Sequence, residues 1–151
     1  MAAELRRTKI LVWDPAALPG PVRVGRGRLA VSLEVRSLGR DLLVTVSGGQ
    51  AHAGAVAMAA SGVAAPGGGL LVLPPHKEGP LAEECARTVS AAAGCTCVAT
   101  AGIHQDGATP PEIAAIVANA RAGIKRLAAD LASVPPAQRY CSARLPKPRT
   151  P

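Results

Sequence analysis

Apolar and polar residues alternate along residues 28–38, which is the pattern of a strand with one buried face. A tight turn at residues 39–41 and an apolar run at 42–46 follow, so the two segments predict a β-hairpin. Shorter apolar runs predict further strands at residues 9–13, 55–60, 70–73 and 95–101. Residues 70–73 are apolar at every position, which favours a central strand that is buried on both faces.

Apolar residues recur every three or four positions in two later segments, which predicts helices at residues 80–93 and 110–133. Gly94 follows the first helix at the position where glycine commonly ends one. Thr109 and Glu112 form a capping-box pattern at the start of the second helix. The residues spaced for the buried stripe of that helix are Ile113, Ile116, Val117, Ala120, Ile124, Leu127 and Leu131.

These elements predict a single α+β domain over residues 1–133, with a mixed, mostly antiparallel sheet and two main helices on one face. Residues 134–151 are rich in proline and carry only basic charges, so we expect a flexible tail there. An open sheet face and unpaired sheet edges favour a homo-oligomer.

The formal net charge of +7 is unevenly distributed. Four basic residues and no acid lie after Val134, which gives +4 there and leaves +3 for the remainder of the chain. The chain has no Phe, one Trp and one Tyr, whereas nucleic-acid binders more usually combine a basic folded domain with stacking aromatics. The charge therefore favours an anionic small ligand or an acidic protein partner over nucleic acid.

No apolar segment approaches the roughly 20 residues of a transmembrane helix, and the N-terminal residues do not form a signal peptide. The four cysteines have neither the spacing of a CxxC redox pair nor that of a zinc knuckle. We therefore expect reduced thiols in a cytoplasmic protein that does not associate with membranes.

The chain has three histidines, His52, His76 and His104, and each lies where an apolar strand meets a loop. Ligand sites in open α/β sheets form beyond the carboxyl ends of such strands, so we expect the three imidazoles to share one sheet edge. They offer either a metal site of neutral imidazoles or hydrogen bonds to an anionic ligand. Lys77, at a predicted helix start, favours the anion.

Small and acidic residues flank these histidines. Gly49 and Gly54 either let the backbone approach a ligand closely or serve the turns. Asp106 has two equally suitable roles. It can form a loop turn, or it can orient the His104 imidazole or bind a metal ion. The serines and cysteines match no nucleophile motif, and Glu78 alone follows a histidine closely enough to suggest a general base.

Three segments, residues 48–57, 73–78 and 101–106 with the Thr-Pro-Pro-Glu-Ile helix start that follows, resemble the LpdD-like family in order and spacing. These are small prenylated-flavin chaperones associated with UbiD-type decarboxylases, and the similarity spans roughly residues 28–131. Ala53 departs from the family, whose members commonly carry a bulkier apolar residue at that position.

The resemblance implies an accessory protein that binds prenylated FMN, the product of a flavin prenyltransferase. It would help to mature or load a UbiD-type decarboxylase of hydroxyaromatic acids. The phosphate would lie near Lys77 and the helix start, with a divalent metal ion between the three histidines and the phosphate as a further option. The implied cofactor-site residues are Gly49, His52, Gly54, His76, Lys77 and His104.

Two other interpretations stay open. In the first, the three histidines hold a divalent ion that activates water, and the protein is a hydrolytic metal-dependent enzyme. In the second, the protein is a small subunit of a decarboxylase complex and has no ligand of its own.

Overall fold

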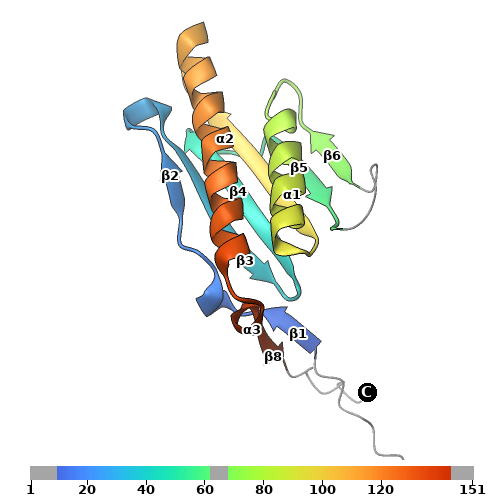
Figure 1. The fold of residues 1–151 in the computed structure, drawn as a ribbon. Coiled ribbons are helices and arrows are strands. Elements are labelled where there is room, and N and C mark those ends of the chain that lie inside the picture. The colour runs from blue at the N-terminus through green and yellow to red at the C-terminus, as the bar shows by residue number, and fades with distance from the viewer. Residues whose placement is uncertain (1–9, 62–67, 144–151) are drawn as a thin grey trace, which may run out of the picture.

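The computed structural model describes residues 10–61 and 68–143 and consists of a single α+β domain. Its main sheet has six strands in the order β2-β3-β4-β7-β5-β6 (Figure 1). Neighbouring strands are antiparallel except β4 and β7, which are parallel. The strands are β2 (Val22–Val24), β3 (Val31–Leu38), β4 (Asp41–Gly49), β5 (Ala55–Ala59), β6 (Gly69–Val72) and β7 (Cys97–His104). The predicted mixed, mostly antiparallel sheet and the β3–β4 hairpin are confirmed.

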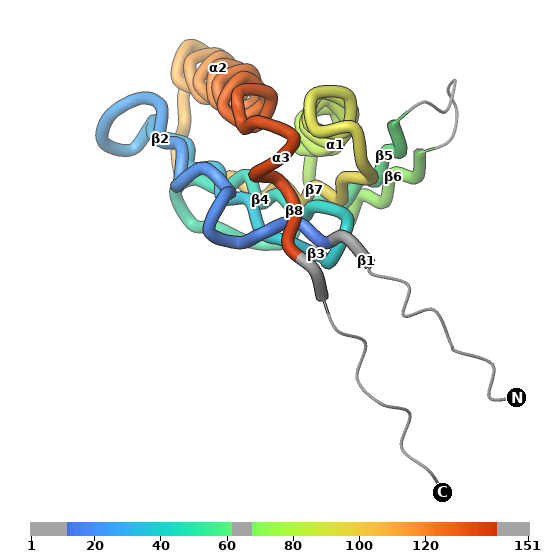
Figure 2. Tube along the Cα trace, turned by 60° about the horizontal axis from the view of Figure 1, so that its bottom comes forward, coloured from blue at the N-terminus to red at the C-terminus, as the bar shows by residue number. Residues whose placement is uncertain are grey.

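Two long helices, α1 (Gly79–Ala93) and α2 (Pro110–Ser133), lie side by side on one face of this sheet, as predicted (Figures 1 and 2). The capping box of α2 is formed by both of its hydrogen bonds, between the Thr109 side chain and the Glu112 amide and between the Glu112 side chain and the Thr109 amide. Gly94 ends α1 with a φ of 72°, a conformation that glycine adopts without strain. None of the described helices is long and apolar enough to cross a membrane.

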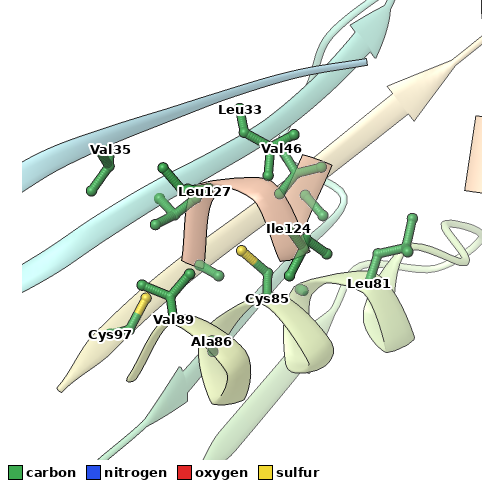
Figure 3. Close-up of a cluster of buried hydrophobic side chains, with 14 of the residues drawn as sticks. Leu33, Val35, Val46, Leu81, Cys85, Ala86, Val89, Cys97, Ile124 and Leu127 are labelled. Carbon is green, nitrogen blue, oxygen red and sulfur yellow. The ribbon is translucent and has the colours of Figure 1, made fainter. Parts of the chain in front are cut away.

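The hydrophobic core lies between the two helices and the sheet (Figure 3). Leu33 and Val46 of the sheet face Ile124 and Leu127 of α2, and all four are buried. Helix α1 contributes mostly small side chains, including Cys85 and several alanines. Because these side chains are short, the helices pack close to the sheet without aromatic residues between them.

Two predictions of burial are wrong. Residues 70–73 lie in or next to β6, an edge strand, and Leu71 is 65% exposed, because β6 pairs only with β5. An apolar run reports hydrophobicity, but its burial depends on which strands flank it. Ile113 is 51% exposed, because the first turn of α2 extends beyond the end of the sheet (Figure 1).

Residues 134–143, which we expected within a flexible tail, form the short helix α3 (Pro136–Arg139) and strand β8 (Tyr140–Ala143). Strand β8 pairs antiparallel with β1 (Ile10–Trp13) and forms a second, two-stranded sheet. Trp13 is completely buried, with the ring of Tyr140 at 5.4 Å and the guanidinium of Arg139 at 5.8 Å from its ring centroid. Burial of the Trp13 indole explains why residues 134–143 pack against β1. Residues 144–151 lie outside the described part.

Candidate functional site

The strand order brings the ends of four strands to one edge of the sheet. Strands β4, β6 and β7 run in the same direction, and β5, which lies between β7 and β6, runs in the opposite one. The carboxyl ends of β4, β6 and β7 therefore meet the beginning of β5 at the upper edge in Figure 1. His52 lies in the loop between β4 and β5, His76 between β6 and α1, and His104 at the end of β7.

The three histidine rings gather at this edge. The ring centroid of His52 lies 4.3 Å from that of His76 and 6.4 Å from that of His104. The geometry that we expected for the imidazoles is therefore present, with β5 inserted between the strands that carry His76 and His104.

A carboxylate joins two of the histidines. Nε2 of His52 lies 3.0 Å from Nδ1 of His76 and 3.4 Å from Oε1 of Glu78, whose second oxygen lies 4.0 Å from Nδ1 of His76. One donor atom from each of the three residues lies within 4.8 Å of the others, and the three side chains are partly buried. Two imidazoles and a carboxylate at this spacing are a donor set that suits a transition-metal ion.

Backbone amides fix the Glu78 carboxylate. The amide of Lys77 donates to Oε2 at 2.8 Å, and the amide of Ile103 donates to Oε1 at 3.3 Å. Only 12% of the Glu78 side chain is exposed. The sequence suggests only a general base at Glu78. Its position two residues after His76, in the same loop at the start of a helix, is the sequence signal that places it beside the imidazole.

His104 is oriented by a separate set of hydrogen bonds. Its Nε2 donates to Oδ1 of Asp106 at 2.9 Å, and the Gln50 side-chain amide donates to Oδ2 of Asp106 at 2.6 Å. These two hydrogen bonds lower the pKa of the Asp106 carboxyl. The backbone carbonyl of Gln50 accepts a hydrogen bond from Nδ1 of His52 at 3.0 Å, so Gln50 contacts both sets, through its side chain and through its backbone.

The two candidate glycines permit close contacts within the protein. A Cβ atom on Gly54 would lie 2.9 Å from Oε2 of Glu78 and 3.0 Å from Nε2 of His52. Gly49 has a φ of 58°, and a Cβ atom there would overlap the carbonyl oxygen of His104. The sequence did not point to Gly102, where a Cβ atom would overlap the carbonyl oxygen of His52. These glycines let the histidine segments pack on one another.

The positive charge around this edge has two sources. Lys77 is exposed and lies just before α1. Glu78, the residue that directly precedes this helix, makes no side-chain capping hydrogen bond to the helix amides. On the open face of the sheet, a hollow of about 370 Å³ reaches Gly49 and Gln105 and contains the side chains of Arg23 and Arg28. The described surface near the histidines is thus able to attract an anion at two points.

Comparison with known protein families gives one match. The family described as prenylated flavin chaperone LpdD-like domain matches residues 25–132, which include all three histidines and Glu78. This match confirms the resemblance that the three histidine segments suggested. No curated protein matches the chain.

Proposed function

Because the chain belongs to the prenylated flavin chaperone LpdD-like family, we propose that it binds prenylated FMN and helps to mature or load a UbiD-type decarboxylase. The observation that carries the proposal is the meeting of the three family-like histidine segments at one sheet edge. On this proposal the cofactor contacts are made by Gly49, His52, Gly54, His76, Lys77 and His104.

The residues at this edge fit the chemistry of a phosphorylated flavin. Imidazoles supply hydrogen bonds to polar ring atoms, and Lys77 or the hollow with Arg23 and Arg28 offers partners for the phosphate. Trp13 and Tyr140 pack against each other at the opposite end of the sheet. The flavin ring would therefore contact imidazoles and aliphatic side chains. When bound, prenylated FMN supplies the reactive ring system that a decarboxylase needs, and the residues of this chain hold and orient it.

We also propose that the protein assembles as a homo-oligomer and receives its ligand from the flavin prenyltransferase pathway. Support for assembly comes from exposed leucines at the edge strand β6, namely Leu70 and Leu71 within it and Leu73 directly after it, and from the sheet face that the helices leave open. The cysteines of the described part are free thiols, in keeping with a cytoplasmic site of action.

The His52, His76 and Glu78 group favours one other candidate function, that of a metal-dependent hydrolytic enzyme. A hydrolytic enzyme of this kind needs a base to accept a proton from the attacking water. Glu78 already accepts hydrogen bonds from two backbone amides and contacts both histidines, so it is poorly placed to act as that base. The third interpretation, a decarboxylase subunit without a ligand, gives no role to the convergence of the histidines.

The test is a binding measurement with reduced prenylated FMN made by a flavin prenyltransferase. We expect the purified protein to retain the flavin through gel filtration, with its absorbance spectrum perturbed, and to activate an apo UbiD-type decarboxylase. His104→Ala and Lys77→Ala should weaken binding, whereas Lys125→Ala, which removes an exposed cation on α2, should not. Hydrolysis of ester substrates without flavin binding would establish the enzyme instead. A tight complex with the decarboxylase, formed by a chain that itself binds neither flavin nor metal, would establish the ligand-free subunit.

A further inference from the structure

We propose that His52, His76 and Glu78 form a mononuclear site for a divalent transition-metal ion of the Zn²⁺ class, and that His104 is not a ligand. The sequence grouped the three histidines as potential ligands, whereas the structure gathers the donor atoms of two histidines and a carboxylate.

The distances between the donor atoms approach those around a tetrahedral ion. Ligand atoms about 2.0–2.1 Å from Zn²⁺ at tetrahedral angles are separated from one another by about 3.3 Å. Nε2 of His52 and Nδ1 of His76 are 3.0 Å apart, and Glu78 presents Oε1 to Nε2 of His52 at 3.4 Å and Oε2 to Nδ1 of His76 at 4.0 Å. An ion bound by both nitrogens and one carboxylate oxygen requires that oxygen to approach Nδ1 of His76 by at least about 0.7 Å, a shift within reach of side-chain rotation.

The orientation of each donor is set by its neighbours. A carbonyl oxygen can only accept, so the contact with Gln50 places the proton of His52 on Nδ1 and leaves the lone pair of Nε2 directed at His76. The two amides that bind the Glu78 carboxylate hold it beside Nε2 of His52. Such hydrogen bonds to the far side of a ligand are the usual support of metal sites.

The same orientation leaves the lone pair of Nε2 of His52 available to a proton donor or to a cation. With the proton of His52 on Nδ1, a direct contact between Nε2 and Nδ1 of His76 needs a proton on the latter. A metal ion instead accepts lone pairs from both nitrogens, and the negative charge of Glu78 offsets part of its charge. Two imidazoles in the donor set favour Zn²⁺, Fe²⁺ or Ni²⁺ over Mg²⁺ and Ca²⁺, which prefer oxygen ligands.

His104 is engaged elsewhere. Its Nε2 donates to Asp106, and its ring centroid lies 6.4 Å from that of His52. Three protein ligands leave one tetrahedral position open, as in metal sites that bind a further ligand. This position is available to an oxygen atom of a bound anion. The assignment of that oxygen to the phosphate of prenylated FMN rests on the proposed function, whereas the metal site itself does not.

Metal affinity of the untagged protein, measured without flavin by competition of Zn²⁺ with a chromophoric chelator, tests the site. We expect one ion per chain, and a loss of affinity of roughly 100-fold or more in His52→Ala, His76→Ala or Glu78→Gln, larger than the effect of removing an outer hydrogen bond. His104→Ala is the matched control and should retain affinity within about threefold, that is within ~0.7 kcal/mol. Equal losses in His104→Ala and His76→Ala, or no binding by the wild-type protein, would overturn the assignment.

Co²⁺ substitution provides a measurement on the wild-type chain, independent of whether each variant folds. A four-coordinate Co²⁺ site with nitrogen and oxygen ligands gives visible absorbance without a thiolate charge-transfer band. Such a band would assign the ion to cysteines and refute the site. Flavin binding is then measured with and without a chelator. Flavin binding by a chain that binds no metal would refute the metal site alone, and metal binding without flavin would refute the proposed function alone.

Discussion

Gly102→Ala should displace the loop that carries His52 without replacing any histidine or carboxylate of the candidate site. Gly102 lies in β7, paired with Ser47 of β4, and the backbone of His52 crosses directly over it. A Cβ atom at this position would overlap the His52 carbonyl oxygen and lie 2.5 Å from its carbonyl carbon. Strand β7 is held between β4 and β5, so the loop is the part that moves.

The size of the displacement follows from the contact distances. Ordinary van der Waals contact with a Cβ atom begins at 3.4 Å, so the His52 carbonyl group must move by at least the 0.9 Å that its carbon needs. Functional sites generally need their groups within about 0.5 Å of the working geometry. We expect Zn²⁺ affinity to fall by roughly 10-fold to 100-fold, or about 1.4–2.7 kcal/mol. The free energy of unfolding should fall by about 1–3 kcal/mol, as in other over-packed variants.

Gly20→Ala is the control, because no atom lies within 4 Å of a Cβ atom built there. Affinity comes from chelator competition and stability from urea unfolding, both at a temperature where the variant is fully folded. Loss of stability with wild-type affinity would show that the contact between β7 and the loop does not position His52. Wild-type values for both quantities would refute the close approach itself.

Three further predictions concern the fold. Leu127→Ala should destabilise the protein by about 2–5 kcal/mol because the side chain is fully buried, whereas the half-exposed Ile113→Ala should cost little; urea unfolding compares them. Two hydrogen bonds from Thr109 lower the pKa of Glu112, so their stabilisation is present above the ordinary pKa of 4.5 and is lost as the pH falls below it. Glu112→Gln should therefore flatten the acid limb of a stability–pH curve, and an unchanged limb would contradict this origin. Burial raises the pKa of Cys97 to about 12, so this thiol stabilises the fold below its ordinary pKa of 9.0 and the stabilisation is lost progressively as the pH rises from there; the native thiol should resist thiol reagents until the protein unfolds.

Features governed by neighbouring residues were predictable from the sequence. The capping box that begins α2 needs only Thr109 and Glu112, three residues apart, and it forms as the pattern indicates. The hairpin of β3 and β4 similarly depends on one alternating segment, one short turn and one apolar segment. In both cases the residues that decide the structure are adjacent in the chain.

Features governed by residues far apart in the chain were not predictable from the sequence. The four apolar residues at 70–73 have the composition of a central strand, but β5 gives β6 only one neighbour. Trp13 is buried by Tyr140 from the far end of the chain, so no local pattern reveals that residues 134–143 dock. The sequence placed His52, His76 and His104 at strand ends, but their separations depend on the insertion of β5 between β7 and β6.

The candidate site also depends on two glycines, which have no side chain. Gly102 has no Cβ atom, so the backbone of the His52 loop can rest on β7, and Gly54 has none, so the His52 ring and the Glu78 carboxylate can meet. A larger residue at either position would separate donors that now lie 3.4 Å apart. Chemistry-bearing residues alone therefore predict only which groups approach the edge. Gly54 and Gly102 decide whether His52 and Glu78 can touch, and neither glycine carries a reactive group that would mark it as part of the site.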